Sequence, residues 1–363
     1  MKVTNVYHKN TALLYDDLYQ KGGGEKLFLQ ITHLCKEAKI YVPIVSKFYR
    51  QKLKSRNLKY SFILSFIANN FGNVGYKFSS FLSLFWFESL NLNDFELVLS
   101  VSNRFSHCVI TPIHTKHICL ITSPFRQIWE QYNINPAVRF FYSYLRIHNY
   151  VSARRPNTII SISNYVQGKI KKYWGLNSIV INPPIILSNH YFINKLDNKF
   201  NFKNKDYFLL VGRLNGRKSK YFERVIKIFN KNGINLVVVG NGGKYFALKN
   251  KYKQNNIYFL GEIDEKSLFN LYKNARALIH PQIEDFGLTP LESLHFGTPV
   301  IAYNKGGVTD YLNNKVSFLY DKTNEIPGII QNLQNFKFNK KAALKILKLH
   351  SIQKFEYNLY KLF

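Results

Sequence analysis

Two glutamates, Glu284 and Glu292, flank a glycine loop that could bind a phosphorylated sugar. The stretch reads Glu-Asp-Phe-Gly-Leu-Thr-Pro-Leu-Glu, follows an apolar run and leads through Pro290 into a helical pattern. Backbone N–H groups at a helix N-terminus favour a negative ligand such as a phosphate. A carboxylate there would repel the phosphate unless it accepted hydrogen bonds from sugar or ribose hydroxyls. The alternative interpretation is an ordinary loop that carries acidic residues.

A second glycine loop follows closely. The run Pro299-Val300-Ile301-Ala302 reads as a buried strand, and Gly306-Gly307 comes after its end. The two loops would then lie at the same edge of one sheet, where one ligand could touch both.

A basic cluster follows another apolar run. Arg213 and Lys218 lie in Gly-Arg-Leu-Asn-Gly-Arg-Lys, directly after the strand that ends at Val211. On a strand-to-helix turn both could converge on a diphosphate, Arg with a bidentate fork and Lys as a mobile charge. A solvated charge run is the alternative. A weaker signal is Gly22-Gly23-Gly24 before a helical pattern, where a ligand could approach the backbone or where the loop is simply flexible.

Together these stretches resemble the family 4 retaining glycosyltransferases, which have the GT-B fold. The Glu-x7-Glu motif is matched by Glu284 and Glu292, the Gly-Arg-Leu-x3-Lys motif by residues 212–218, and the N-terminal glycine loop by residues 22–25. The resemblance extends through residues 87–90, 123–129, 161–166 and 180–184. The Glu-Asp-Phe-Gly form is most similar to mannosyltransferases that assemble bacterial O-antigen and related polysaccharides.

The resemblance implies a role for each matched residue. Glu284 would contact the donor sugar near its anomeric carbon, and Glu292 would bind the ribose hydroxyls. Arg213 and Lys218 would neutralise the departing diphosphate, to which Gly287, Leu288 and Thr289 offer backbone N–H groups. Gly23 and Gly24 would approach the donor from the other domain.

One position departs from the family pattern. Where the family usually has a histidine that contacts the donor sugar, this chain has Thr122. The hydroxyl is the expected sugar contact, and the substitution raises the alternative of a non-catalytic relative that binds a nucleotide sugar or a partner enzyme. The sequence has no Asp-x-Asp motif, so we expect no metal and no other cofactor beyond the nucleotide-sugar co-substrate.

The pattern of elements predicts an α/β protein with two Rossmann-like, doubly wound domains facing across a cleft. Short apolar runs alternate with helical patterns, which is typical of open α/β sheets. We expect an N-terminal acceptor-side domain over residues 1–187, a linker over 188–206, a nucleotide-sugar-binding domain over 207–340 and closing helices over 341–363. Nine strands are predicted, at residues 39–42, 97–100, 118–121, 158–161, 207–211, 236–239, 257–260, 277–279 and 299–302.

The net charge of +30 favours an anionic partner. General enrichment in lysine explains part of it, and no nucleic-acid-recognition motif is present, so nucleic acid is not an expected partner. Six basic residues between Lys47 and Lys59 precede an apolar run ending at Phe87, which could rest on an anionic membrane, although a solvated basic face is the alternative.

The three scattered cysteines and the absence of a long apolar segment at the N-terminus favour a cytoplasmic protein, with a peripheral place on the inner face of the membrane as a further expectation. The partners expected are a nucleotide-diphosphate sugar, GDP-mannose foremost, and a saccharide or polyprenyl-linked acceptor.

Overall fold

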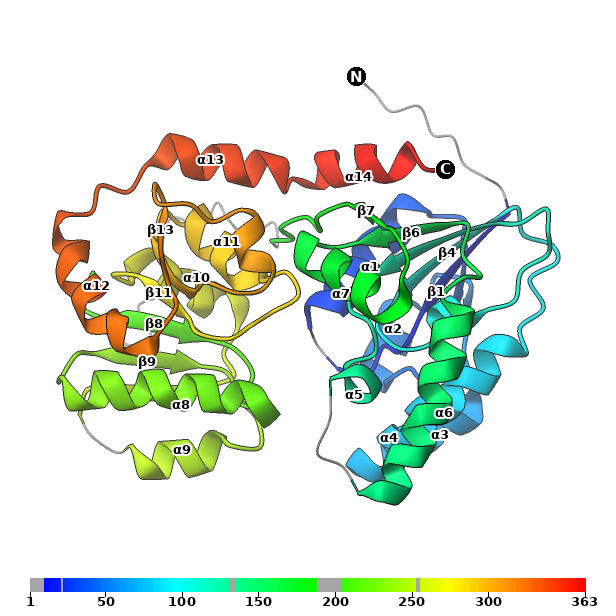
Figure 1. Cartoon of the computed structure of the whole chain (residues 1–363), viewed down its shortest axis with the longest axis horizontal. Helices are drawn as coiled ribbons and strands as arrows, with labels where there is room; N and C mark the ends of the chain where they lie inside the picture. Colours follow the sequence, from blue (N-terminus) through cyan, green and yellow to red (C-terminus); the bar gives the residue numbers. More distant parts are fainter. Residues whose placement is uncertain (1–9, 21, 131–134, 188–203, 253–254) are drawn as a thin grey trace. The chain divides into compact units, whose positions relative to one another are not determined.

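A computed structural model describes residues 10–20, 22–130, 135–187, 204–252 and 255–363, without the side chains of Ala137, Arg217 and Lys218. Its residues form two compact units (Figure 1). Unit 1 consists of Met1–Ile186 with Ile352–Phe363, and unit 2 consists of Leu187–Ser351. Most of the predicted linker lies outside the described residues.

Unit 1 is built on a parallel seven-stranded sheet with the order β3-β2-β1-β4-β5-β6-β7. The strands are β1 (Thr11–Tyr15), β2 (Lys39–Tyr41), β3 (Leu58–Lys59), β4 (Leu97–Ser102), β5 (Lys116–Ile121), β6 (Thr158–Ser161) and β7 (Ile179–Val180). Every residue of β1 and β4 is buried, as expected for central strands covered on both faces. The strand order reverses between these two, so their carboxyl ends flank a crevice.

Eight α-helices of unit 1 connect and cover these strands. They are α1 (Gly23–Leu34), α2 (Lys47–Lys52), α3 (Phe62–Asn70), α4 (Gly72–Glu88), α5 (Arg126–Trp129), α6 (Pro136–Ser152), α7 (Asn164–Trp174) and α14 (Ile352–Tyr360), as counted among the described residues. Local signals explain their ends. The Ser163 hydroxyl accepts from the Val166 N–H at the start of α7, and Gly175, with φ of +71°, terminates it.

Unit 2 has a parallel six-stranded sheet with the order β10-β9-β8-β11-β12-β13. The strands are β8 (Phe208–Val211), β9 (Leu236–Val239), β10 (Ile257–Gly261), β11 (Leu278–His280), β12 (Val300–Tyr303) and β13 (Ser317–Tyr320). The helices are α8 (Gly216–Lys231), α9 (Tyr245–Lys251), α10 (Glu265–Asn274), α11 (Leu288–His295), α12 (Ile326–Asn332) and α13 (Lys340–Leu349). Here the strand order reverses between β8 and β11.

The predicted α/β class is confirmed, with two parallel, doubly wound sheets. All nine predicted strands are present, with boundaries within two residues of the predicted ones. The sequence interpretation missed β1, β3, β7 and β13. Among the described residues, no helix combines the length and the apolar character needed to cross a membrane.

Candidate functional site

The predicted donor site lies where β8 and β11 end, at the strand-order reversal of unit 2. Loops that follow adjacent strands at such a point form the usual ligand crevice of a doubly wound sheet. The structure brings the two loops together, since a Cβ on Gly212, after β8, would lie 3.6 Å from Gln282 Nε2, after β11. The β8 and β11 loops therefore form one wall.

The loop after β12 packs directly on the Glu284 loop. The Gly307 N–H donates to the Glu284 carbonyl over 2.8 Å. Gly306 has φ of +95°, and a Cβ there would lie 2.5 Å from the same carbonyl oxygen, so only glycine allows this approach. The second glycine loop thus fixes the backbone that carries Glu284.

Glu284 and Glu292 both influence two buried tyrosines, Tyr272 and Tyr311. The Tyr272 hydroxyl donates to Glu292 Oε2 over 2.9 Å. Burial raises the pKa of Tyr272 well above its ordinary value, and the negative charges of Glu292 and then Glu284 raise it further. The pKa of Tyr311 is raised by burial, then by Glu284, Asp310 and Glu292. Both carboxylates therefore act electrostatically on both phenols, and their binding of one donor stays a prediction.

A buried histidine supports the loop between them. His280 ends β11 with 1% of its surface exposed, and its Nδ1 lies 3.2 Å from both Gln282 Nε2 and Thr289 Oγ1. An Nδ1 that accepts from these donors places the ring proton on Nε2, which lies 4.0 Å from Glu284 Oε2. The Glu284 side chain is 23% exposed, so it can still reach a ligand.

The N-terminus of α11 adjoins the two glutamates. Gly287 precedes Leu288 and Thr289 with φ of +90°, and a Cβ there would lie 2.6 Å from Val308 Cγ1. The Tyr311 hydroxyl donates to the Gly287 carbonyl and holds this turn. Backbone N–H groups at the start of α11 are thus placed beside the carboxylates, as an anion site requires.

The structure describes the side chain of Arg213 but only the backbone of Lys218. Arg213 is exposed in the loop directly after β8, next to Gly212. Lys218 lies within α8, but its side chain is outside the described part of the chain. The convergence of the two on one diphosphate stays a prediction.

Comparisons with known proteins show a family to which part of the chain is similar. Residues 192–342 match the family model described as glycosyl transferases group 1, which takes in β8 to β13 and the whole site above. This segment of the chain is similar to glycosyl transferases group 1. The family resemblance predicted from the sequence is confirmed.

Two curated relatives and one solved protein show the range of the similarity. An uncharacterized glycosyltransferase of Methanocaldococcus jannaschii is 31% identical over 31% of this chain and 30% of its own length. The O-antigen chain mannosyltransferase RfbU of Salmonella typhimurium is 27% identical over 44% of this chain and 45% of its own length. The matched part of the chain thus spans less than half of each relative.

The solved structure supports the fold over the whole chain. Anabaena HepE in complex with UDP superposes with a TM-score of 0.70 and 15% identity, covering 97% of this chain and 98% of that one. Its complex with UDP-glucose gives a TM-score of 0.71 at 14% identity over the same shares. This likeness confirms the GT-B fold.

In unit 1, the predicted contacts lie at strand ends. Gly23 and Gly24 begin α1, and a Cβ on Gly24 would lie 2.6 Å from the Tyr15 hydroxyl at the end of β1. Thr122 follows β5, and its hydroxyl donates to the Ser102 carbonyl at the end of β4 over 3.2 Å. Both positions therefore have a structural role whatever their role in binding.

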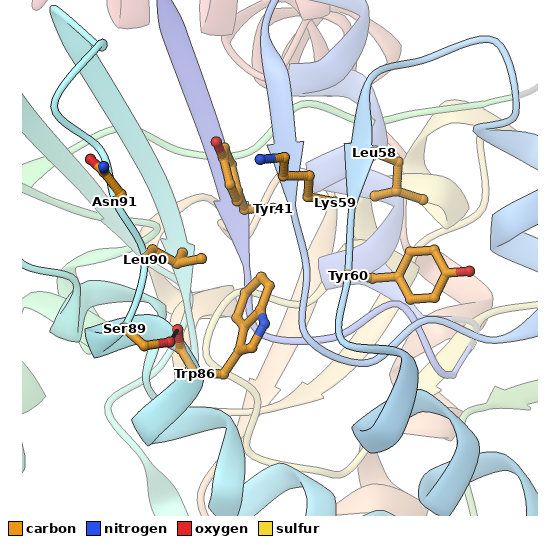
Figure 2. Close-up of a pocket in the computed structure, with 8 residues that line it drawn as sticks. All are labelled: Tyr41, Leu58, Lys59, Tyr60, Trp86, Ser89, Leu90 and Asn91. Carbon is orange, nitrogen blue, oxygen red and sulfur yellow. Dashed lines mark hydrogen bonds between the residues drawn. The ribbon is translucent and has the colours of Figure 1, made fainter.

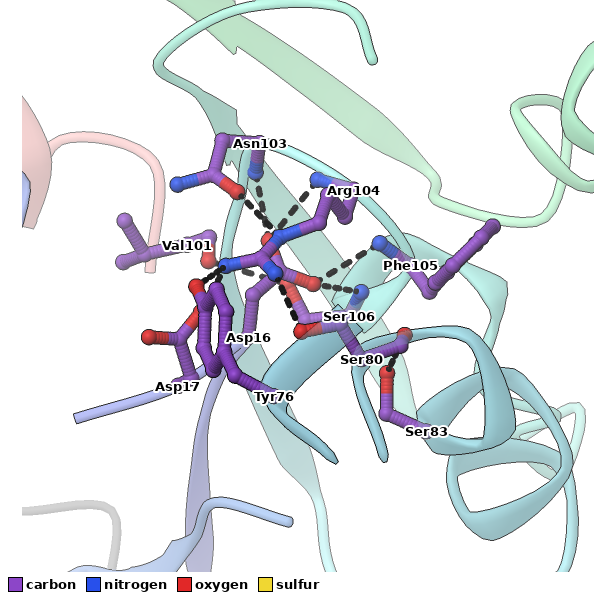
Figure 3. Close-up of polar contacts among 10 residues, drawn as sticks. All are labelled: Asp16, Asp17, Tyr76, Ser80, Ser83, Val101, Asn103, Arg104, Phe105 and Ser106. Atoms are coloured by element: carbon purple, nitrogen blue, oxygen red, sulfur yellow. Dashed lines mark hydrogen bonds and ion pairs between the residues drawn. The ribbon is translucent and has the colours of Figure 1, made fainter. Parts of the chain in front are cut away.

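A buried ionic cluster at the reversal of the unit 1 sheet was missed by the sequence interpretation (Figure 3). The Asp16 carboxylate accepts from four successive backbone N–H groups, those of residues 103–106, over 2.5 to 2.9 Å. Arg104 pairs with Asp17 and donates to the Tyr76 hydroxyl over 3.0 Å. The cluster ties the loop after β1 to the loop after β4. Its sequence signal is an Asp pair directly after an apolar run.

A cavity of about 430 Å³ opens on unit 1 away from these residues (Figure 2). Its walls combine aromatic rings with a lysine and small polar side chains, namely Tyr41, Leu58, Lys59, Tyr60, Trp86, Ser89, Leu90 and Asn91. None of the predicted site residues lines it. In the described parts of the chain, no group of three or more His, Cys, Asp or Glu side chains could hold a metal ion.

A further glycine loop, after β9, was also missed. In the loop after β9, the Gly243 N–H donates to Asn215 Oδ1 over 2.6 Å, and a Cβ on Gly242 would lie 2.6 Å from the same oxygen. The Asn-Gly-Gly after an apolar run was the available signal. This loop supports the start of α8, on which Lys218 lies.

Proposed function

We propose that the chain is a retaining glycosyltransferase that transfers a hexose from a nucleotide-diphosphate sugar to a saccharide or polyprenyl-linked saccharide. The observation that carries the proposal is the position of Glu284 just before α11 and of Glu292 within it, on either side of the helix start at Gly287. Carboxylates suit the hydroxyls of the donor, and the helix N-terminus suits its phosphates. The match to glycosyl transferases group 1 over this segment supports the same activity.

In this proposal each side chain has a defined task. Glu284 binds the hexose hydroxyls near the anomeric carbon, and Glu292, oriented by Tyr272, binds the ribose hydroxyls. Arg213, Lys218 and the first N–H groups of α11 stabilise the negative charge that develops on the departing diphosphate. With retention, the acceptor attacks from the face that the phosphate leaves, and a phosphate oxygen takes the acceptor proton. No metal enters this scheme.

In this proposal the two domains bind different substrates. We assign the nucleotide sugar to residues 207–340 and the acceptor to residues 1–187, with Gly23, Gly24 and Thr122 contacting the donor from the N-terminal side. Residues 341–363 supply the closing helices, α13 and α14.

Mannose from GDP-mannose is our preferred donor, because the Glu-Asp-Phe-Gly form occurs in this chain and RfbU, an O-antigen chain mannosyltransferase, is among its relatives. HepE was solved with UDP and with UDP-glucose, which makes a uridine donor the main competitor. A thermal-shift screen with GDP-, UDP-, dTDP- and ADP-sugars decides between them, since a ligand bound to the folded state raises its melting temperature.

Transfer assays test the activity itself. Glu284→Ala should abolish transfer, and Lys218→Ala should raise the donor KM, while Glu262→Ala, a control in the loop after β10, should leave both unchanged. Anomeric configuration of the product, read by NMR, tests retention. Near wild-type turnover in Glu284→Ala would refute the assignment.

The second candidate is a non-catalytic relative that binds a nucleotide sugar or a partner enzyme. Thr122 favours it, because its hydroxyl already donates to the Ser102 carbonyl. Donor binding without transfer, across a broad panel of lipid-linked and free acceptors, would support this candidate over the first.

We place the protein in the cytoplasm at the inner face of an anionic membrane, where a polyprenyl-linked acceptor would be presented. The exposed lysines 47, 52 and 54 support this placement. Arg56 does not, because its guanidinium donates to the Thr32 and Cys35 carbonyls over 2.8 Å each and so has a structural role.

A further inference from the structure

Exposed apolar side chains are concentrated on three helices of unit 1. Of the twenty-two large apolar side chains that are exposed among the described residues, fourteen lie on α3, α4, their junction and α6. They are Phe62, Ile63, Phe66, Phe71, Val74, Phe78, Phe85, Val138, Phe140, Phe141, Tyr144, Ile147, Tyr150 and Val151. The whole of unit 2 contributes three, Phe246, Leu344 and Leu349. We call the fourteen the apolar surface.

On α6 the exposed residues form a regular stripe. Phe140, Tyr144, Ile147 and Val151 recur at spacings of four, three and four residues, which places them on one side of a helix. The other side carries Leu145 and Asn149, which are buried. The helix therefore packs normally on unit 1 and presents a second apolar face to the solvent.

The same spacing recurs on α4. Val74, Phe78 and Phe85 are exposed and Phe81 is half-buried, again at intervals of four, three and four residues. The rings of Phe81 and Phe141 lie 4.7 Å apart, so the two helices meet at the edges of their stripes. α3 packs along α4, and α6 lies beside them in Figure 1. Apolar patches of this extent on a soluble domain mark an interaction site.

The charges on and around the apolar surface favour an anionic partner. Residues 62–87 and 136–152 contain no Asp or Glu, while they contain Lys77 and Arg139, as well as Arg146, whose Nε donates to the Ile128 carbonyl. Glu88, the first acidic residue after α4's apolar run, is engaged by His148 over 3.0 Å and Arg155 over 2.6 Å. Beyond the surface, Lys47 and Lys52 of α2 are exposed.

We infer that α3, α4 and α6 form the surface with which this protein docks on a bilayer rich in anionic phospholipids. The aromatic and aliphatic stripes would enter the boundary between headgroups and acyl chains, and the bordering cations would pair with lipid phosphates. The inference deepens the proposed function by naming its membrane contact, and it predicts lipid binding without donor or acceptor.

Vesicle flotation at low salt tests the inference. The intact chain should float with vesicles of phosphatidylcholine and phosphatidylglycerol, and far less with phosphatidylcholine alone. The variant Phe78→Ser/Phe140→Ser/Ile147→Ser should lose at least about tenfold in binding. The matched control, Ile113→Ser/Phe246→Ser/Leu344→Ser, removes three equally exposed apolar side chains and should float like the wild type. Equal flotation of the two triple variants would overturn the inference.

A second measurement reports how deeply the apolar surface enters the bilayer. Phe140→Trp should gain a blue-shifted emission that brominated lipid quenches, whereas Ile113→Trp should not. Absence of flotation by the wild type, with a dimer in light scattering that the first triple variant dissociates, would show that a second copy covers the surface instead. Neither result touches the proposed activity, which the Glu284→Ala assay tests separately.

Discussion

The hydroxyl of Tyr272 donates to Glu292, and this contact yields a residue-scale prediction. Tyr272→Phe removes a hydrogen bond to a charged group, worth about 1.5–3 kcal/mol, and should raise the donor KM about tenfold or more with little change in kcat. The effect should shrink with a donor that lacks the ribose hydroxyls, because Glu292 then has no ligand group to hold. Steady-state kinetics with both donors measure it.

Tyr207→Phe is the matched control. This tyrosine is also buried, but its hydroxyl donates to the Leu271 carbonyl over 2.8 Å, away from the glutamates. It should lower stability without changing the donor KM. An equal KM effect in both variants would mean that Tyr272 acts through the fold alone.

The residue types of the site could be predicted from the sequence, but their partners could not. Glu284, Gly287 and Glu292 form a local motif, so their spacing alone places them around a helix start. Tyr272 and Tyr311 come from distant parts of the chain, and only the packed sheet brings them to the carboxylates. His280 directly follows the predicted strand 277–279, and no local pattern links it to the site.

At the scale of elements, the strands with dense β-branched runs were predictable, whereas β1, an interior strand of unit 1, was not. β9, with three consecutive valines, matches its prediction at both ends. β1 reads Thr-Ala-Leu-Leu-Tyr, a sequence that suits a helix equally well. Its strand conformation is fixed by pairing with β2 and β4, a tertiary effect that no local pattern carries.

The packing of α1 on β1 gives a prediction that separates structure from binding. Gly24→Ala places a methyl group against the Tyr15 hydroxyl and should lower the free energy of unfolding by about 1–3 kcal/mol. Tyr15→Phe removes that oxygen and should restore most of the loss. All three tryptophans lie in unit 1, so their fluorescence during denaturation measures the stability of that unit.

The rescued double variant then tests the binding role. If the backbone at Gly24 approaches the donor, Gly24→Ala/Tyr15→Phe should be stable and still show a raised donor KM. Gly168→Ala, within α7 and with no atom near the added methyl group, is the control for both measurements. Wild-type kinetics in the double variant would limit Gly24 to a packing role.

For the whole molecule, composition predicted an anionic partner but not where the chain would meet it. The charge of +30 is a sum over the sequence, whereas the apolar surface depends on which faces of α4 and α6 remain uncovered after folding. Sequence analysis noted the run that becomes α3 and α4 and overlooked α6. An apolar stripe on a helix predicts burial by default, and here the second stripe stays exposed.

The stability of unit 1 should depend on pH through two buried histidines. Burial lowers the pKa of His107 and of His117 to about 3, with nearby positive charges, Arg155 among them, contributing. In the unfolded chain their pKa is about 6.5, so between these values the unfolded state binds protons that the folded state refuses. The free energy of unfolding should therefore be highest above pH 6.5 and fall towards pH 3. Each histidine should contribute a slope of up to about 1.4 kcal/mol per pH unit.

Tryptophan-monitored denaturation tests this dependence. In His117→Gln, the slope of the free energy of unfolding against pH should be smaller by the contribution of one histidine. His114→Gln, at an exposed histidine three residues earlier, should keep the wild-type slope, and an unchanged slope in His117→Gln would contradict the assignment.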